Sequence, residues 1–132
     1  MTQNPSTPAD TPQSQAEQPD SGQAPPDPRI ARFEAMVARF PDKSPPRFSL
    51  GRALQDAGRL ADAEPHYARA AELQPDLMMA WLHRAECLMG LGRFAEAQPV
   101  AEEARRLAVA QSHEGPLADV TELLEDLADE LG

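Results

Sequence analysis

The chain has 132 residues and a net charge of −10, and 41% of its residues are hydrophobic while only 5% are aromatic. This length fits one ordinary domain, and so few aromatic residues favour a core of alanine and leucine on thin helices over a β-sandwich or a barrel. An acidic chain repels phosphate backbones and anionic lipid surfaces, so we expect no nucleic acid and no membrane as partner, but a basic or apolar protein surface.

The charges are unevenly distributed. All 12 basic residues lie between Arg29 and Arg106, where 11 acids nearly balance them. Residues 1–28 carry four acids and residues 112–132 carry seven, with no base in either segment. A nearly neutral middle is therefore flanked by two acidic ends.

Three features of the sequence predict a cytoplasmic protein. The single cysteine, Cys87, cannot form an internal disulfide, which fits a reducing compartment. The N-terminus lacks the positive start and the apolar core of a signal peptide. The longest apolar run, residues 77–82, is too short to span a bilayer.

Residues 1–28 are rich in Pro, Gln, Ser and Asp and poor in large apolar side chains. Such a segment cannot bury enough apolar surface to offset the entropy of ordering, so it is predicted to be a disordered tail. P-x-x-P occurs at residues 5–8 and 25–28, the pattern of a ligand for a polyproline-binding domain, but Pro-rich tails contain it often by chance.

Helical spacing of apolar residues begins at Ile30, continues through Phe33, then Met36 or Val37, and Phe40, and ends at Pro41. Further helices are predicted over residues 46–57, 60–73, 76–89, 94–110 and 117–131, and no segment has the pattern of a strand. Pro65 is predicted near the end of the first turn of its helix, where a missing N–H costs least.

Two stretches of the chain repeat each other at a distance of 34 residues. "GRLADAEPHYARAAELQP" at residues 58–75 and "GRFAEAQPVAEEARRLAV" at residues 92–109 share Gly, Arg, Ala, Pro and Leu at equivalent positions. A period of this length indicates an array in which each unit buries its apolar face only against its neighbours.

The repeat resembles the tetratricopeptide repeat, whose signature runs W-x2-L-G-x2-Y, then A-x3-F, then P. Residues 44–77 and 78–111 each resemble one repeat, and the second departs from the pattern at Arg84, Ala101 and Val109. The positions that match or replace the motif are Leu50, Gly51, Gly58, Ala63, Tyr67, Ala70, Pro75, Trp81, Ala85, Gly92, Ala97 and Ala104.

The resemblance implies an all-α, right-handed α-solenoid over residues 29–132. Residues 29–43 would be the end of a degenerate first repeat, and residues 116–131 a C-terminal capping helix. Within each repeat Gly51 and Ala85 would let two helices approach closely. Gly58 and Gly92 would adopt positive φ in the turns, while Tyr67 and Trp81 would fill the space between units.

Catalytic or metal-binding chemistry finds little support in the sequence. His83 and Cys87 stand four residues apart on one predicted helix, but two ligands do not make a metal site. We therefore expect His83 to face the groove and Cys87 to pack, and we expect His66 and His113 to be solvated. No nucleophile or phosphate-binding motif is present, so neither an enzyme, a cofactor nor a metal is predicted.

The resemblance implies a non-enzymatic protein-binding module, because the inner helices of such arrays line a concave groove that takes a peptide or a helix of a partner. The implied groove residues are Phe48, Ser49, Arg52, Gln55, Met79, Leu82, His83, Glu86 and Met89. Arg52 and Glu86 are expected to pair with each other across the repeats. The methionines make an adaptable apolar surface or complete the core, and the sequence leaves both possibilities open.

An alternative function is a scaffold that oligomerises through the helix at residues 116–131. Its Leu117, Val120, Leu124, Leu127 and Leu131 form one apolar stripe, which must be covered. Six acids on the remaining face would repel each other in a two-stranded seam, so a cap on the last repeat and a monomeric protein are favoured over a homodimer.

Overall fold

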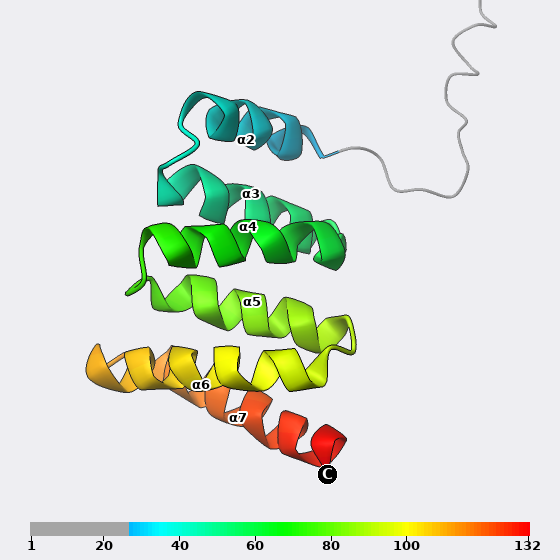
Figure 1. The fold of residues 1–132 in the computed structure, drawn as a ribbon, viewed down its shortest axis with the longest axis vertical. Helices are drawn as coiled ribbons and strands as arrows, with labels where there is room; N and C mark the ends of the chain where they lie inside the picture. The colour runs from blue at the N-terminus through cyan, green and yellow to red at the C-terminus, as the bar shows by residue number, and fades with distance from the viewer. Residues whose placement is uncertain (1–26) are drawn as a thin grey trace, which may run out of the picture.

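The protein is described by a computed structural model in which residues 27–132 are placed. The tail predicted over residues 1–28, with its two P-x-x-P segments, lies outside the described residues except for Asp27 and Pro28. The described part contains six α-helices and no strand: α2 (Pro28–Arg39), α3 (Ser44–Asp56), α4 (Leu60–Leu73), α5 (Met78–Gly90), α6 (Phe94–Ala110) and α7 (Glu114–Leu131). Each helix packs against the next one along the chain, which gives one elongated stack (Figure 1). The predicted all-α solenoid is confirmed.

Prolines explain where two helices begin earlier than predicted. α3 begins at Ser44 because Pro45 and Pro46 lie in its first turn, where no N–H is needed. α7 begins at Glu114 and includes Pro116 in the same way. Pro65 is different, because it is the sixth residue of α4 and so lies inside the helix beyond the first turn. The prediction for Pro65 was wrong.

The exposed surface of the stack tolerates Pro65 and its equivalent Pro99 in α6. A proline at either position removes the hydrogen bond to the carbonyl four residues earlier, on Ala61 or Ala95. All four residues are exposed, so water can solvate the freed carbonyl oxygens.

Among the described residues the core consists of three clusters of buried side chains between the helices. Gly51 of α3 lies under the ring of Tyr67 of α4, and a Cβ on Gly51 would come within 2.8 Å of Tyr67 Cε1. Tyr67 is fully buried, as are Ala63 and Ala70 on the same helix. The larger core cluster joins α5, α6 and α7 through residues such as Leu88, Ala104 and Leu127.

Three turns share one geometry. Gly58 and Gly92 have φ of 78° and 77°, as predicted, and Ser112 has φ of 60° in the turn between α6 and α7. In each turn this residue donates its N–H to a carbonyl three residues earlier, on Gln55, Met89 or Val109. The turn before α7 is thus of the kind found inside a repeat. This turn comes later in its repeat than the end of α4 does. Val109 occupies the position that Pro75 has after α4, and without a proline there α6 continues to 17 residues, whereas α4 has 14.

A charged contact joins the two full repeats. Glu64 of α4 is only 7% exposed, and Arg84 Nε of α5 donates a hydrogen bond to its Oε2 at 2.7 Å. Arg93 Nη1 lies 3.9 Å from Oε1 of the same carboxylate. Thirty-four residues earlier in the sequence the equivalent positions are Ile30 and Leu50, which belong to one apolar cluster.

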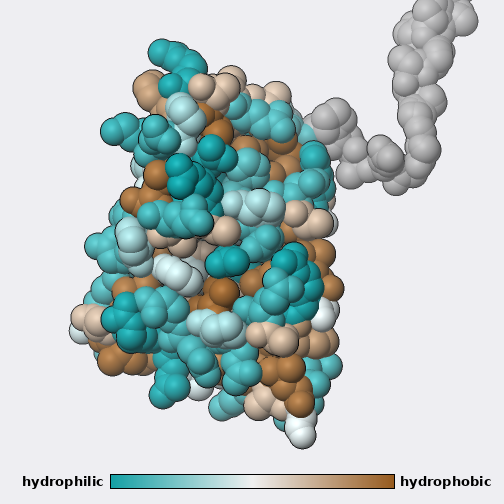
Figure 2. All heavy atoms as spheres, in the orientation of Figure 1, coloured by the Kyte–Doolittle hydropathy of each residue, from teal (hydrophilic) through white to brown (hydrophobic). Residues whose placement is uncertain are grey.

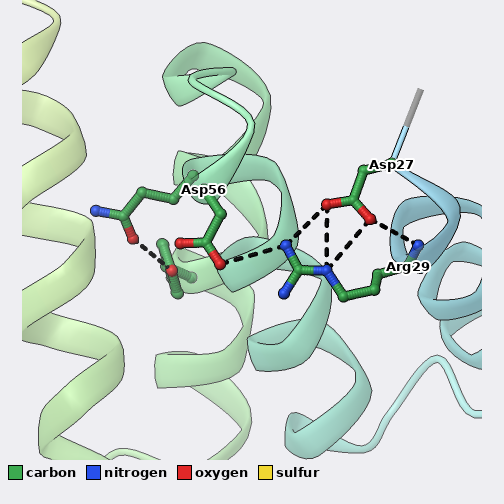
Figure 3. Close-up of polar contacts among 5 residues, drawn as sticks. Asp27, Arg29 and Asp56 are labelled. Carbon is green, nitrogen blue, oxygen red and sulfur yellow. Dashed lines mark hydrogen bonds and ion pairs between the residues drawn. The ribbon is translucent and has the colours of Figure 1, made fainter. Parts of the chain in front are cut away.

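An exposed ion-pair group fastens α2 to α3. Arg29 donates hydrogen bonds to Asp27, two residues before it, and to Asp56 at the C-terminal end of α3 (Figure 3). Asp27 also caps α2 by accepting from the backbone N–H of Arg29 at 2.8 Å. These hydrogen bonds from Arg29 lower the pKa of Asp27.

Candidate functional site

The side chains predicted to line the groove come from α3 and α5, and we call this set the α3–α5 surface. Arg52 is exposed, and Phe48, Ser49, Gln55, Met79, His83, Glu86 and Met89 are partly exposed. Leu82 is only 2% exposed and belongs to the core cluster with Leu88 and Leu107, so a ligand cannot reach it. Met79 and Met89 pack against the same cluster while part of each remains at the surface.

Three rings form the floor of the α3–α5 surface. The ring centroids of Phe48 and Tyr67 are 5.7 Å apart in an edge-on arrangement. The imidazole of His83 lies 5.5 Å from Tyr67 and 5.9 Å from Phe48. One ring comes from each of α3, α4 and α5, so the cluster ties the two repeats together beneath the surface.

A chain of hydrogen bonds runs across the same floor. Tyr67 donates its O–H to Gln55 Oε1 at 2.6 Å, and Gln55 Nε2 donates to Glu86 Oε1 at 3.0 Å. His83 Nδ1 lies 2.8 Å from the same oxygen of Glu86. Because a carboxylate can only accept, Nδ1 carries the proton. The amide of Gln55 is fixed in one orientation by its two partners.

Glu86 is held ionised by this network. Its burial alone would raise the pKa, but the hydrogen bonds from His83 and Gln55 and the positive charge of Arg52 lower the pKa below its usual value. Both hydrogen bonds reach Oε1, so Oε2 has no partner among residues 27–132. The side chain of Glu86 is 37% exposed, so solvent reaches part of it.

The predicted ion pair between Arg52 and Glu86 does not form. Gln55 and His83 occupy the carboxylate instead, and within the described chain no acid lies within 4.0 Å of the Arg52 guanidinium. Sequence spacing alone placed the two charges on facing helices but could not show that a glutamine and a histidine stand closer.

The other candidate residues fall into two groups. Cys87 is fully buried, and burial first, then the charges of Glu86 and Glu64, raises its pKa to about 12, so it packs as an apolar side chain. His113 is exposed, as expected. His66 is half-buried, not solvated; its burial, together with the charge of Arg47, lowers its pKa. Residues 27–132 contain no group of three His, Cys, Asp or Glu side chains that could hold a metal ion.

Two features of the site were missed at the level of sequence. The first is the bond from Tyr67 to Gln55, which converts a packing residue into part of a polar network. The second is the contact of Glu64 with Arg84. Its signal was present, because Arg84 stands where the repeat pattern has leucine, and a charge at a core position needs a partner.

Solved structures with similar folds were found by comparison. The structure of PcrH in complex with the chaperone-binding region of PopD has a TM-score of 0.74 and 26% identity, over 78% of this chain and 78% of that one. The type III secretion translocator chaperone SycD of Yersinia enterocolitica has a TM-score of 0.72 and 24% identity, over 75% and 69%. The TPR2B domain of yeast Sti1, in a complex with an Hsp70 peptide, has a TM-score of 0.70 and 16% identity, over 76% and 81%.

No model of a protein family matches the sequence, and no curated protein matches it either. The fold comparison and the 34-residue pattern together place this chain among proteins with the tetratricopeptide-repeat fold. Within residues 27–132 no helix is both long and apolar enough to cross a membrane.

Proposed function

We propose that the chain is a protein-binding module whose α3–α5 surface takes a peptide segment of a partner protein. The observation that carries this proposal is a pair of charged groups on that surface that retain hydrogen-bonding capacity. Arg52 has no acidic partner within the described chain, and Glu86 Oε2 accepts no hydrogen bond there. A guanidinium and a carboxylate on neighbouring helices can bond to the carbonyl and N–H groups of one peptide backbone.

The surroundings of these charges suit a peptide with apolar side chains. Phe48, Met79 and Met89 are partly exposed, and flexible thioethers adapt to side chains of different shape. The ring cluster and the hydrogen-bond chain below hold Glu86 and His83 in place before a ligand arrives, which lowers the entropy lost on binding. PcrH and SycD have been solved with a segment of PopD and a peptide of YopD, which supports a peptide as the ligand class.

Some grooves of the tetratricopeptide-repeat family grip the terminal carboxylate of a peptide, and that kind of groove is not proposed here. It needs Asn and Lys or Arg at positions that here hold Pro45, Ser49, Met79 and His83. An internal segment of a partner fits these residues better than a terminal carboxylate.

Charge reversal at Arg52 tests the proposal. Proteins captured from a lysate by the full chain are compared with those captured by Arg52→Glu, Met89→Glu and the control Lys43→Glu, which carries the same charge change outside the surface. We expect both surface variants to lose a protein that the control retains, with unchanged melting by circular dichroism for Arg52→Glu. Equal capture by all variants would place the binding site elsewhere.

A further inference from the structure

The last helix carries a second, mostly apolar line that is only partly covered, because Leu117 and Leu124 pack against the core cluster while its other members are exposed. Val120 and Leu127 are 1% and 0% exposed against α6. A second line follows steps of four and three residues, which places its members side by side on one helix face. It consists of Leu117, Thr121, Leu124, Ala128 and Leu131, and we call it the α7 face. The single stripe expected from the sequence is thus split between core and surface.

The α7 face is open where the equivalent parts of α3 and α5 are covered. Gly51 is covered by Tyr67, and Ala85 and Leu88 are fully buried against α6. On α7, Thr121 and Ala128 are exposed and Leu131 is 45% exposed. A hollow of about 330 Å³ lies there, lined by Arg105 of α6 and by Thr121, Leu124, Glu125 and Ala128 of α7. Figure 2 shows hydrophobic residues at the surface near this end of the stack.

At the opposite end of the stack, α2 also has apolar residues at the surface. Met36 of α2 lies 34 residues before Ala70, which is fully buried in a cluster that Phe48 of α3 contacts, yet Met36 is 38% exposed and Phe40 is 40% exposed. With Arg29 and Phe33 these residues follow the same four-and-three spacing, and we call this line the α2 face. α2 thus lacks an inner helix before it, and α7 lacks an outer helix after it, among the described residues (Figure 1).

The helices that carry the two faces are opposite in net charge. α2 carries Arg29, Arg32 and Arg39 against one acid, Glu34. Arg32 and Arg39 form no ion pair in the described part of the chain and lie over the rings of Phe33 and Phe40. Seven acids and no base follow residue 111, and none of the seven forms an ion pair among the described residues. Two α7 faces would repel each other, whereas an α2 face and an α7 face attract.

We propose that a second copy of this chain docks head to tail, with the α2 face of one protomer on the α7 face of the next. The contact would complete a helix pair across the two protomers and continue the stack. Because such an interface does not close on itself, the assembly grows with concentration. The contact is looser than the internal one. Gly51, Ala85 and Thr121 are each the eighth residue of their helix, and Thr121 is the largest of the three.

Two variants, each of which blocks one of the two faces, test the head-to-tail arrangement. Met36→Glu blocks the α2 face and leaves the α7 face intact, and Ala128→Arg does the reverse. In sedimentation velocity at low ionic strength, each variant alone should stay monomeric while the unmodified chain forms oligomers that grow with concentration. A mixture of the two variants should form a 1:1 dimer that grows no further, and added salt should weaken it.

Controls separate this arrangement from others. Ala95→Arg has the same change at an exposed alanine of α6 outside both faces and should associate like the unmodified chain, while Leu131→Arg provides a second block of the α7 face should Ala128→Arg unfold. Thr121→Ala should strengthen association because a smaller residue lets the helices approach. An unmodified chain that is monomeric at millimolar concentration, or folded variants that form no dimer when mixed, would overturn the proposal.

Discussion

At the scale of single residues, the fit between Gly51 and Tyr67 decides how closely two helices approach. The ring of Tyr67 is buried, contacts His83 and Phe48, and has its hydroxyl fixed by Gln55, so it cannot move aside without disturbing the α3–α5 surface. The distance of 2.8 Å that a Cβ would have to Tyr67 Cε1 is too short for any side chain.

Gly51→Leu should therefore lower the free energy of unfolding by about 2 kcal/mol or more, since overpacking drives α3 and α4 apart. Urea denaturation followed by circular dichroism measures the change. Gly115→Ala is the matched control, because a Cβ at Gly115 meets no atom within 4 Å. Equal losses for both variants would contradict this account of Gly51.

Leu82→Glu should also unfold the protein in part, because it would bury a charge in the core cluster. It is thus unsuitable for testing ligand binding, although the resemblance had placed Leu82 among the groove residues.

His66 makes stability depend on pH. Its burial lowers the folded-state pKa below the unfolded value of 6.5, so the folded state binds fewer protons than the unfolded state. The contribution of neutral His66 to the free energy of unfolding is fully present above pH 6.5 and is lost as the pH falls through the folded-state pKa. His66→Gln should reduce the fall in stability between about pH 7.5 and pH 5. An identical pH dependence in the variant would show that His66 does not contribute.

At the scale of the elements, Glu64 and Arg84 replace an apolar contact with an ionic one. Removing one partner leaves the other partly buried and unpaired, so Glu64→Ile or Arg84→Leu alone should cost about 1–3 kcal/mol. The double variant copies Ile30 and Leu50 and should regain most of this loss. A double-mutant cycle by urea denaturation measures the coupling, and additive losses would exclude it. The exposed pair of Arg59 with Asp62 is the control and should contribute less than about 0.5 kcal/mol.

Substitutions in two of the turns should change the stability of the protein in opposite directions. Ser112 has a left-handed backbone that disfavours a side chain, so Ser112→Gly should stabilise the protein by about 0.5 kcal/mol after the larger entropy loss of glycine. Gly58→Ala should destabilise it by about 1 kcal/mol for the same reason. Thermal unfolding measures both, and two shifts of the same sign would contradict the account.

The sequence predicted the bounds of the helices better than it predicted the contacts of individual side chains. α4 and α6 have the predicted bounds because Gly58 and Gly92 precede their first turns, Pro75 follows α4, and alanine fills the faces of both helices. The late turn after α6 could be anticipated only in part, since Val109 in place of proline permits a longer helix without fixing where it stops. The partners of Glu86 could not be predicted, because side-chain reach and packing, rather than spacing, decide which groups meet.

At the scale of the whole molecule, α7 closes the core of the last repeat. Val120 and Leu127 cover the cluster that includes Val100, Leu107 and Ala108. Deleting residues 114–132 should expose this cluster and cause aggregation or loss of cooperative unfolding, measured by light scattering and calorimetry. Deleting only residues 131–132 is the control. A monomeric truncated protein with an unchanged melting temperature would show that the helix is not needed as a cover.

The ionic contact between α4 and α5 has a consequence for the folding of a repetitive chain. Two nearly equivalent repeats can in principle be stacked in the wrong order or exchanged between neighbouring molecules during folding. Glu64 placed against Leu50, or Arg84 against Ile30, would leave a charge unpaired inside an apolar joint. The contact between α4 and α5 is therefore not interchangeable with the contact between α2 and α3. The difference between them disfavours folded states in which the helices are stacked in the wrong order.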